Sequence, residues 1–189
     1  MAISLEQTDG AVTCSAAVLC SGGTLHANAL EALCEEGGTT GSTADNVDMG
    51  TVALTDNIGY MFDCTIPSDV DWDSGDWTIP INFTNGHMDI TLDQVHICRV
   101  NSGCTNQESL GSETGIGFNT ANGLTTRTIS GSAVASPSAG DRVAIVIVFD
   151  KSSSHSARSF DITPNQTITA PFNRAATGRA PQLPLMGVG

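Results

Sequence analysis

Apolar and polar residues alternate along most of the chain after residue 46, and this period of two is that of a half-buried β-strand. The clearest run is DWTIPINFT (76–84), which places Trp77, Ile79, Ile81 and Phe83 on one face. The run DRVAIVIVFD (141–150) is apolar on both faces, so we expect it to be the most buried strand. Further strands are predicted at 47–55, 58–66, 87–92, 94–100, 124–134, 158–162 and 166–171.

Turn signals separate these short strands. Asn85-Gly86 predicts a hairpin that joins 76–84 to 87–92. Pro80 has no amide hydrogen to donate, so its strand should lie at a sheet edge or carry a bulge there. Many short strands with almost no helix predict an all-β protein, an antiparallel β-sandwich of jelly-roll-like form with extended N- and C-terminal arms.

The chain divides into three parts by composition. Residues 1–46 form a predicted N-terminal arm, in which LHANALEALCEE (25–36) has apolar residues at helical spacing and predicts one short helix. Residues 47–172 form the sandwich. Residues 173–189 form an extended tail, because Pro181 and Pro184 prevent a helix. This apolar tail either docks on a neighbouring subunit or packs back on its own sandwich.

The charge balance excludes several partners. The formal net charge is −13 and the pI about 4.3, with Lys151 as the one lysine and six scattered arginines. Nucleic acid and anionic membrane surfaces need clusters of Lys and Arg, so neither is an expected partner. Lysine is depleted at protein interfaces, and its scarcity here favours a protein that makes contacts with other proteins.

Six cysteines are present, none in C-x-x-C spacing, and the four histidines are dispersed, so no zinc site is predicted. Cys98 and Cys104 bracket the turn-like stretch RVNSG, which would allow a disulfide between them. Free thiols in a reducing compartment are the alternative.

The stretch DVDWDSGDWTIP (69–80) concentrates Asp69, Asp71, Asp73 and Asp76 with both tryptophans. It begins like an EF-hand loop, but Ser74 and Pro80 stand where that loop needs Gly and Glu. A looser calcium site and a solvated acidic turn both remain open. Trp77 is in phase with the apolar face and is predicted to be in the core, whereas Trp72 is the better candidate for a contact residue.

No residue pattern indicates a reaction. Asp150, Ser154 and His155 lie close together in FDKSSSHS, but a catalytic triad is defined by its geometry across a fold. The glycine-rich loops lack the lysine and the strand–helix context of a phosphate-binding loop. We therefore expect no enzyme, no cofactor and no metal.

The second half of the chain, about residues 70–189, resembles a group of tailed-phage and marine viral structural proteins. The segments that carry the resemblance are SGDWTIPINF, HICRVNSGC, SGSAVASPSAGDRVAIVIVF, SFDITPNQTITAPF and PQLPLMGVG. The resemblance implies a virion component with a jelly-roll-like sandwich, such as a capsid decoration protein, a head fibre or a tail part. It implies no active site.

The expected function is therefore that of a virion structural protein of a tailed phage, an outer capsid decoration protein that reinforces the shell. It would be a homo-oligomer, with a trimer as the first expectation, and would contact the major capsid protein or other virion proteins. No cationic and apolar leader is visible at the N-terminus, which fits assembly in the host cytoplasm and a final place on the outer surface of the virion. The expected partner contacts are Leu5, Val12, Trp72, Leu183, Leu185, Met186 and Val188.

Two alternatives remain open. One is a tail or head fibre, or a receptor- or carbohydrate-binding sandwich, which needs exposed aromatic residues; Tyr60, Trp72 and Phe118 are the candidates. The other is a calcium-dependent adhesion or hydrolase accessory domain that uses the Asp69–Asp76 loop.

Overall fold

The computed structural model describes residues 2–15, 23–154 and 156–174, and this part of the chain is almost entirely β-strand. It has one short 3-10 turn, η1 (Thr120–Asn122), and the described residues contain no α-helix. The strands are β1 (Ile3–Thr8), β2 (Thr24–Glu35), β3 (Asp45–Asp48), β4 (Leu54–Thr65), β5 (Val70–Asp71), β6 (Gly75–Thr84), β7 (Ile90–Val100), β8 (Asn106–Glu113), β9 (Phe118–Asn119), β10 (Leu124–Gly131), β11 (Arg142–Lys151), β12 (Ser159–Ile162), β13 (Thr167–Ala170) and β14 (Asn173–Arg174).

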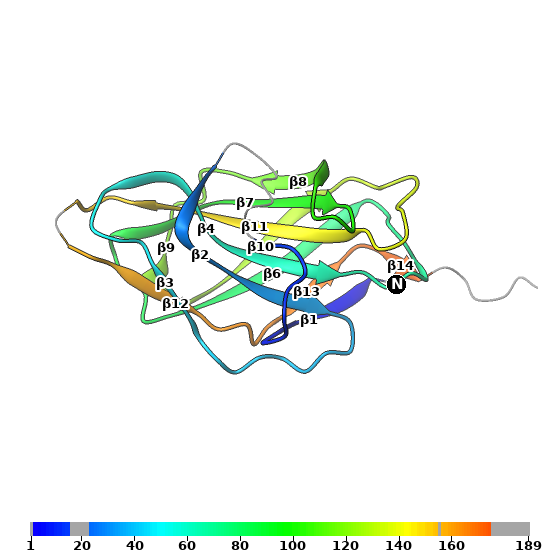
Figure 1. The fold of residues 1–189 in the computed structure, drawn as a ribbon, viewed down its shortest axis with the longest axis horizontal. Helices are drawn as coiled ribbons and strands as arrows, with labels where there is room; N and C mark the ends of the chain where they lie inside the picture. The colour runs from blue at the N-terminus through cyan, green and yellow to red at the C-terminus, as the bar shows by residue number, and fades with distance from the viewer. Residues whose placement is uncertain (1, 16–22, 155, 175–189) are drawn as a thin grey trace, which may run out of the picture.

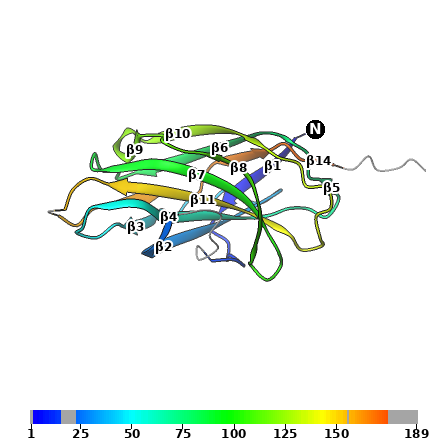
Figure 2. The ribbon, with the colours of Figure 1, turned by 90° about the horizontal axis from the view of Figure 1, so that it is seen from above.

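Twelve strands belong to one sheet that folds over on itself (Figure 1). Their order is β3-β12-β6-β13-β1-β2-β4-β11-β7-β8, with β10 added on β6 and β9 on β7, while β5 and β14 form a separate pair. Seen from above, β10, β6 and β1 lie in one layer and β11, β4 and β2 in the other (Figure 2). The predicted all-β sandwich is confirmed, with one parallel pair, β2 and β4, among antiparallel neighbours.

The main hydrophobic core lies between the two layers. Trp77, Ile79, Ile81 and Phe83 of β6 are all buried in it, while the residues between them are only half-buried. The alternation read from the sequence therefore faces the core as predicted. The opposite layer contributes the inner faces of β4, β7 and β11, which hold the phenyl ring of Phe149 against those of Phe83 and Phe160.

Strand β11 is buried on both faces, as its composition predicts. It pairs with β4 on one side and β7 on the other. Val143, Ile145, Ile147 and Phe149 point into the main core. Ala144, Val146 and Val148 point to the outer face, where they form a second apolar cluster with Cys14, Ile58, Met61, Cys98 and Val100. We call this second group the outer-face cluster.

The helix predicted at 25–36 is wrong, because these residues form β2, which pairs with β1 and β4. From Leu30 onward the strand has a period of two, with Ala32 and Cys34 buried. Cys34 lies opposite Cys64 and is joined to it by a disulfide. Sheet pairing and this cross-link override the local helical spacing, because strand formation depends more on tertiary context than helix formation does. The N-terminal residues are thus part of the sheet and not a free arm.

The hairpin predicted at Asn85-Gly86 is also wrong. Asn85 does turn, with φ of 49°, but β6 pairs with β10 and β7 pairs with β11. The turn therefore carries the chain from one layer to the other. A hydrogen bond from His87 N to Thr120 Oγ1 (3.0 Å) fixes this crossing against η1.

Pro80 is not at a sheet edge, because β6 pairs with β10 from Gly75 to Asn82, with Pro80 opposite Thr126. On its other side, β13 pairs at Thr78 and β12 at Phe83 and Thr84, and Pro80 lies in the gap between them. The Pro80 carbonyl accepts a hydrogen bond from Gln7 Nε2 (2.7 Å) in that gap. Because the N and C=O of one strand residue point to the same side, the missing amide hydrogen of Pro80 removes no ladder bond.

A substitution at Gly86 tests the turn at which the chain crosses from one layer of the sandwich to the other. A Cβ at this position would lie 2.1 Å from the backbone oxygen of Thr120, which cannot move without displacing η1. We expect Gly86→Ala to lower the free energy of unfolding by about 2 to 3 kcal/mol, as overpacking does. Gly103→Ala is the control, since its Cβ would meet only the Asn101 side chain at 3.4 Å. Urea midpoints measure both, and equal midpoints would contradict the crossing.

Candidate functional site

The acidic stretch 69–76 links neighbouring strands through hydrogen bonds and an ion pair. Asp73 Oδ2 accepts a hydrogen bond from Asn173 Nδ2 (2.5 Å), and Asp69 forms an ion pair with Arg174. Asp76 Oδ1 accepts from Ser130 Oγ (2.7 Å). These carboxylates bind different protein partners and do not converge on one point. They tie β5 and β6 to β14 and β10, which favours the acidic turn over a calcium loop.

The two tryptophans pack on the same phenylalanine. The Trp72 ring stacks on Phe172 with centroids 4.9 Å apart, and the Trp77 ring meets Phe172 edge-on at 5.0 Å. The core position predicted for Trp77 is confirmed. Trp72 was expected to be an exposed contact residue, but its side chain is buried, with only 5% of the residue exposed. Trp72 is buried because it packs on Phe172 at the end of the sandwich.

The other predicted contact residues are scattered. Leu5 is fully buried in β1 and belongs to the core, so it offers no surface to a partner. Val12 is half-buried. Leu183, Leu185, Met186 and Val188 lie outside the described residues. Of the aromatic residues proposed for carbohydrate binding, Tyr60 is fully buried and Phe118 is half-buried, so the three do not form an exposed platform.

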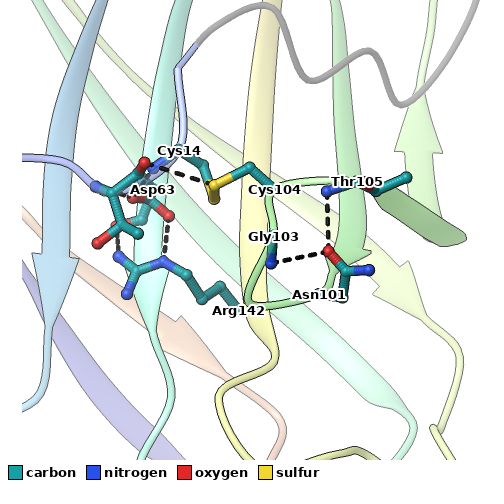
Figure 3. The surroundings of a disulfide bond; sticks show 8 residues. Cys14, Asp63, Asn101, Gly103, Cys104, Thr105 and Arg142 are labelled. Carbon is teal, nitrogen blue, oxygen red and sulfur yellow. Dashed lines mark hydrogen bonds and ion pairs between the residues drawn. A yellow bond between two sulfur atoms is a disulfide. The ribbon is translucent and has the colours of Figure 1, made fainter.

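The disulfide predicted between Cys98 and Cys104 is wrong. Cys104 pairs with Cys14, which is 90 residues away in sequence (Figure 3). Cys98 is also disulfide-bonded, and its side chain is buried in the outer-face cluster. The described cysteines are therefore all oxidised and not free thiols. Sequence spacing missed these pairings because they join segments that only the folded sheet brings together.

Asp63 is a fully buried carboxylate beside the Cys14–Cys104 disulfide (Figure 3). Its Oδ2 accepts hydrogen bonds from the backbone N–H groups of Thr13 (2.7 Å) and Cys14 (2.8 Å). Its Oδ1 accepts from Arg142 Nε at 2.6 Å, and this forms a buried ion pair. Asp63 thus holds the N-terminal segment on the end of β4 and β11 without help from the sulfur atoms.

A group of three carboxylates that the sequence did not indicate lies at the other end of the same strands. Asp56 of β4, Asp93 of β7 and Asp150 of β11 each place an oxygen within 4.8 Å of the others. Register shifts in the pairing of β11 with both neighbours bring these residues together. An aspartate within the first or last few residues of each of three strands was the available signal, but strand neighbours cannot be read from the sequence.

The environment of this group raises the pKa of Asp150. Burial is the main cause, and the charges of Asp93 and Asp56 add to it, while a hydrogen bond from Asp56 N (2.8 Å) acts in the opposite direction. Asp56 Oδ1 also accepts from Gln94 Nε2, and Gln94 Oε1 lies 2.8 Å from His96 Nε2. Burial lowers the pKa of His96. Carboxylates suit hard cations, but three oxygens are fewer than the six to eight that calcium takes.

A second acidic surface surrounds a cavity of about 260 Å³ between β1, β2 and β3. Asp9, Glu31 and Asp45 line it. Burial raises the pKa of Asp45, although a hydrogen bond from the Tyr60 hydroxyl opposes this. Backbone hydrogen bonds from Ser42 and Thr43 lower the pKa of Asp9 despite its slight desolvation. The cavity is therefore rich in negative charge.

Each described arginine faces at least one carboxylate. The pairs are Arg99 with Asp141 and Glu108, Arg127 with Glu113, Arg142 with Asp63, Arg158 with Asp89, and Arg174 with Glu36 and Asp69. Lys151 is only 1% exposed and donates to the carbonyl oxygens of Val52 (3.0 Å) and Ser153. In the described part of the chain, no lysine or arginine presents an unpaired charge to solvent.

The comparisons with known proteins concern the fold alone. No protein-family model matches the sequence, and no curated protein matches it. Two solved structures of a CocE/NonD family hydrolase from Staphylococcus aureus align with it. The first has a TM-score of 0.51, 6% identity and covers 92% of this chain and 36% of the hydrolase. The second has a TM-score of 0.46, 7% identity and covers 91% and 36%. The chain thus spans about a third of the length of that hydrolase.

The described residues include no helix with the length and hydropathy needed to cross a membrane.

Substitutions of Trp72 test whether its ring supports the packing of the core. Trp72→Ala should lower the free energy of unfolding by about 3 kcal/mol, because it removes a buried indole that stacks on Phe172. Trp72→Phe should lose less than half of that. Chemical denaturation measures both variants. A Trp72→Ala variant as stable as the parent would mean that the ring does not support the core.

Asp150 makes stability depend on pH in a defined direction. Because the pKa of Asp150 is raised in the folded state, the folded chain binds more protons than the unfolded chain at acidic pH. Ionised Asp150 therefore lowers the stability of the folded state, and this loss of stability grows as pH rises through the folded pKa. Asp150→Asn keeps an acceptor for Asp56 N and removes the charge. We expect a gain of about 0.5 to 1 kcal/mol at pH 7, which disappears below about pH 4.

Unfolding in EDTA from pH 3 to 8 measures this difference, with the exposed Asp71→Asn as the control. An Asp150→Asn variant that is less stable at pH 7 than the parent would contradict the repulsion.

Proposed function

We propose that the protein is a structural component of a virion of the tailed-phage type, an outer capsid decoration protein that binds to other virion proteins and to copies of itself. The observation that carries this proposal is the surface charge. The described arginines are paired with carboxylates and Lys151 is buried, so the remaining carboxylates dominate the surface. Such a surface is repelled by DNA and suits the outside of a DNA-filled shell.

The cross-linked architecture supports a mechanical role. Disulfides join Cys14 to Cys104 and Cys34 to Cys64, and the first spans 90 residues. Both restrain the unfolded chain, and persistent disulfides are typical of proteins that work outside reducing compartments. A virion surface after release is such an environment. Assembly in the host cytoplasm remains part of the proposal, with the disulfides closing after lysis.

The proposal also assigns no catalytic activity to the chain. Its buried charged groups have structural partners: Asp63 binds backbone N–H groups and Arg142, and Asp141 binds Arg99 and Ser138 N. The hydrolase with a similar fold does not transfer its activity, because function is carried by sites and not by folds. A fold that forms about a third of that larger protein is also compatible with an accessory domain.

The tail is the part of the chain that we propose to bind neighbouring subunits. Residues 175–189 begin directly after β14, which pairs with β5 at the end of the sandwich (Figure 1). The N-terminal residues are already used in the sheet, so exchange of an N-terminal arm is not part of the mechanism. The tail is mostly uncharged and carries Leu183, Leu185, Met186 and Val188. Burial of these apolar side chains favours docking of the tail of one copy on another copy.

Solution mass tests this assembly. We expect the full-length chain to form a stable oligomer, a trimer by preference, and a chain that ends at Arg174 to be a monomer. Leu183→Ser with Leu185→Ser should dissociate the oligomer by removing apolar contacts, and Gln182→Ala is the matched control. Light scattering measures the mass. A full-length chain that is monomeric, or an oligomer that survives loss of the tail, would contradict the assembly.

The location on a particle needs a separate test. Mass spectrometry of density-purified particles from lysates that carry the gene should detect this chain together with the major capsid protein. Its absence from such particles would shift the conclusion to a free binding module.

A further inference from the structure

The Cys14–Cys104 and Cys34–Cys64 disulfides differ in how easily a reductant reaches them. Cys34 and Cys64 are both fully buried between neighbouring strands β2 and β4. Cys14 is also fully buried, but Cys104 is half-exposed in the loop between β7 and β8. Thiol–disulfide exchange needs direct access of a thiolate to one sulfur atom. Of these four cysteines Cys104 is the partly exposed one, so we infer that attack in the folded protein takes place there.

The backbone at Cys104 is held in an unusual conformation. Its φ is 61°, the left-handed region that residues with a side chain rarely adopt. Asn101 maintains this turn: its Oδ1 accepts from Gly103 N (3.0 Å) and Thr105 N (2.9 Å), and its carbonyl accepts from Cys104 N (2.9 Å) (Figure 3). The loop therefore presents Cys104 to Cys14 through hydrogen bonds that do not depend on the sulfur–sulfur bond.

The other half of the disulfide is held independently in the same way. Asp63 binds the N–H groups of Thr13 and Cys14, and Arg142 fixes Asp63. The two sulfur atoms would thus stay close after reduction, at a high effective concentration. A disulfide with one partly exposed cysteine and two separately held halves can open and close without unfolding the sheet.

We propose that Cys14–Cys104 is a reversible redox clamp that fastens the N-terminal segment to the β7–β8 loop. A thiolate of a dithiol reductant attacks Cys104 Sγ, the bond to Cys14 breaks, and Cys14 leaves as a thiolate that takes up a proton. The second thiol of the reductant then attacks the mixed disulfide, which releases Cys104 and leaves the reductant as a cyclic disulfide. Two electrons pass to the protein, and oxidation reverses the step.

The clamp lies at the edge of the outer-face cluster. Cys14 is a buried member of that cluster, and Cys104 packs on its edge. Opening the disulfide removes the covalent link between the N-terminal segment and the β7–β8 loop, while the hydrogen bonds of Asp63 and Asn101 keep both halves in place. This inference is independent of the proposed location on a virion.

Timed reduction tests the clamp in the native full-length protein. The protein is treated with dithiothreitol, samples are alkylated at intervals, and peptide mass spectrometry gives the rate at which each cysteine becomes labelled. We expect Cys14 and Cys104 to be labelled at least tenfold faster than Cys34 and Cys64, with unchanged circular dichroism. Equal rates, or labelling only as the β-signal is lost, would overturn the proposal.

Substitution of Asn101 tests whether the loop helps the disulfide to re-form. A disulfide with a purely structural role would not depend on the Asn101 hydrogen bonds for its rate of reoxidation. Asn101→Ala removes the two side-chain hydrogen bonds that hold the Cys104 turn, so reoxidation after removal of the reductant should slow by about three- to tenfold through a lower effective concentration. Ser102→Ala, in the same loop and exposed, is the matched control and should reoxidise at the parent rate. Equal reoxidation rates for all three proteins would overturn the role of the loop.

Discussion

The burial of β11 on both faces is the constraint on which the rest of the molecule depends. A strand with apolar side chains on both sides needs a second layer over one face and a separate cover over the other. The layer that contains β6 covers the inner face and builds the main core. The outer face is covered by a cluster that includes Cys14, which is fixed by a disulfide and by Asp63. The described N-terminal residues are therefore part of the folding unit, because β1 pairs within the sheet and Cys14 packs in the outer-face cluster.

The pairing of the arginine and lysine side chains within the fold determines the charge of the surface. The buried carboxylates Asp63 and Asp141 each hold an arginine, and Lys151 is held by backbone carbonyls. The cations thus stabilise the structure internally and leave the exterior acidic. Two places concentrate the remaining negative charge, the Asp56–Asp93–Asp150 group and the cavity lined by Asp9, Glu31 and Asp45. In both places carboxylates from three separate segments of the chain lie close together.

The same fold in part of a much larger hydrolase shows how little a sandwich alone says about activity. In this chain the polar groups that reach the interior serve packing and cross-linking, and the tryptophans close one end of the sandwich. A redox-sensitive fastening of the N-terminal segment adds a device that depends on the fold and not on any particular partner.

The sequence by itself determined the class of fold, the burial of β11, and the inward face of β6 with Trp77, because period-two patterns report directly on which face is buried. It misassigned residues 25–36, the partner of β6, the exposure of Trp72 and the disulfide of Cys104. Only the tertiary structure decided these, since each depends on which distant segments become neighbours: β2 beside β4, Phe172 beside Trp72, and Cys14 beside Cys104. The carboxylate group at Asp56, Asp93 and Asp150 belongs to the same category, because strand order and register shifts are long-range properties that no local pattern encodes.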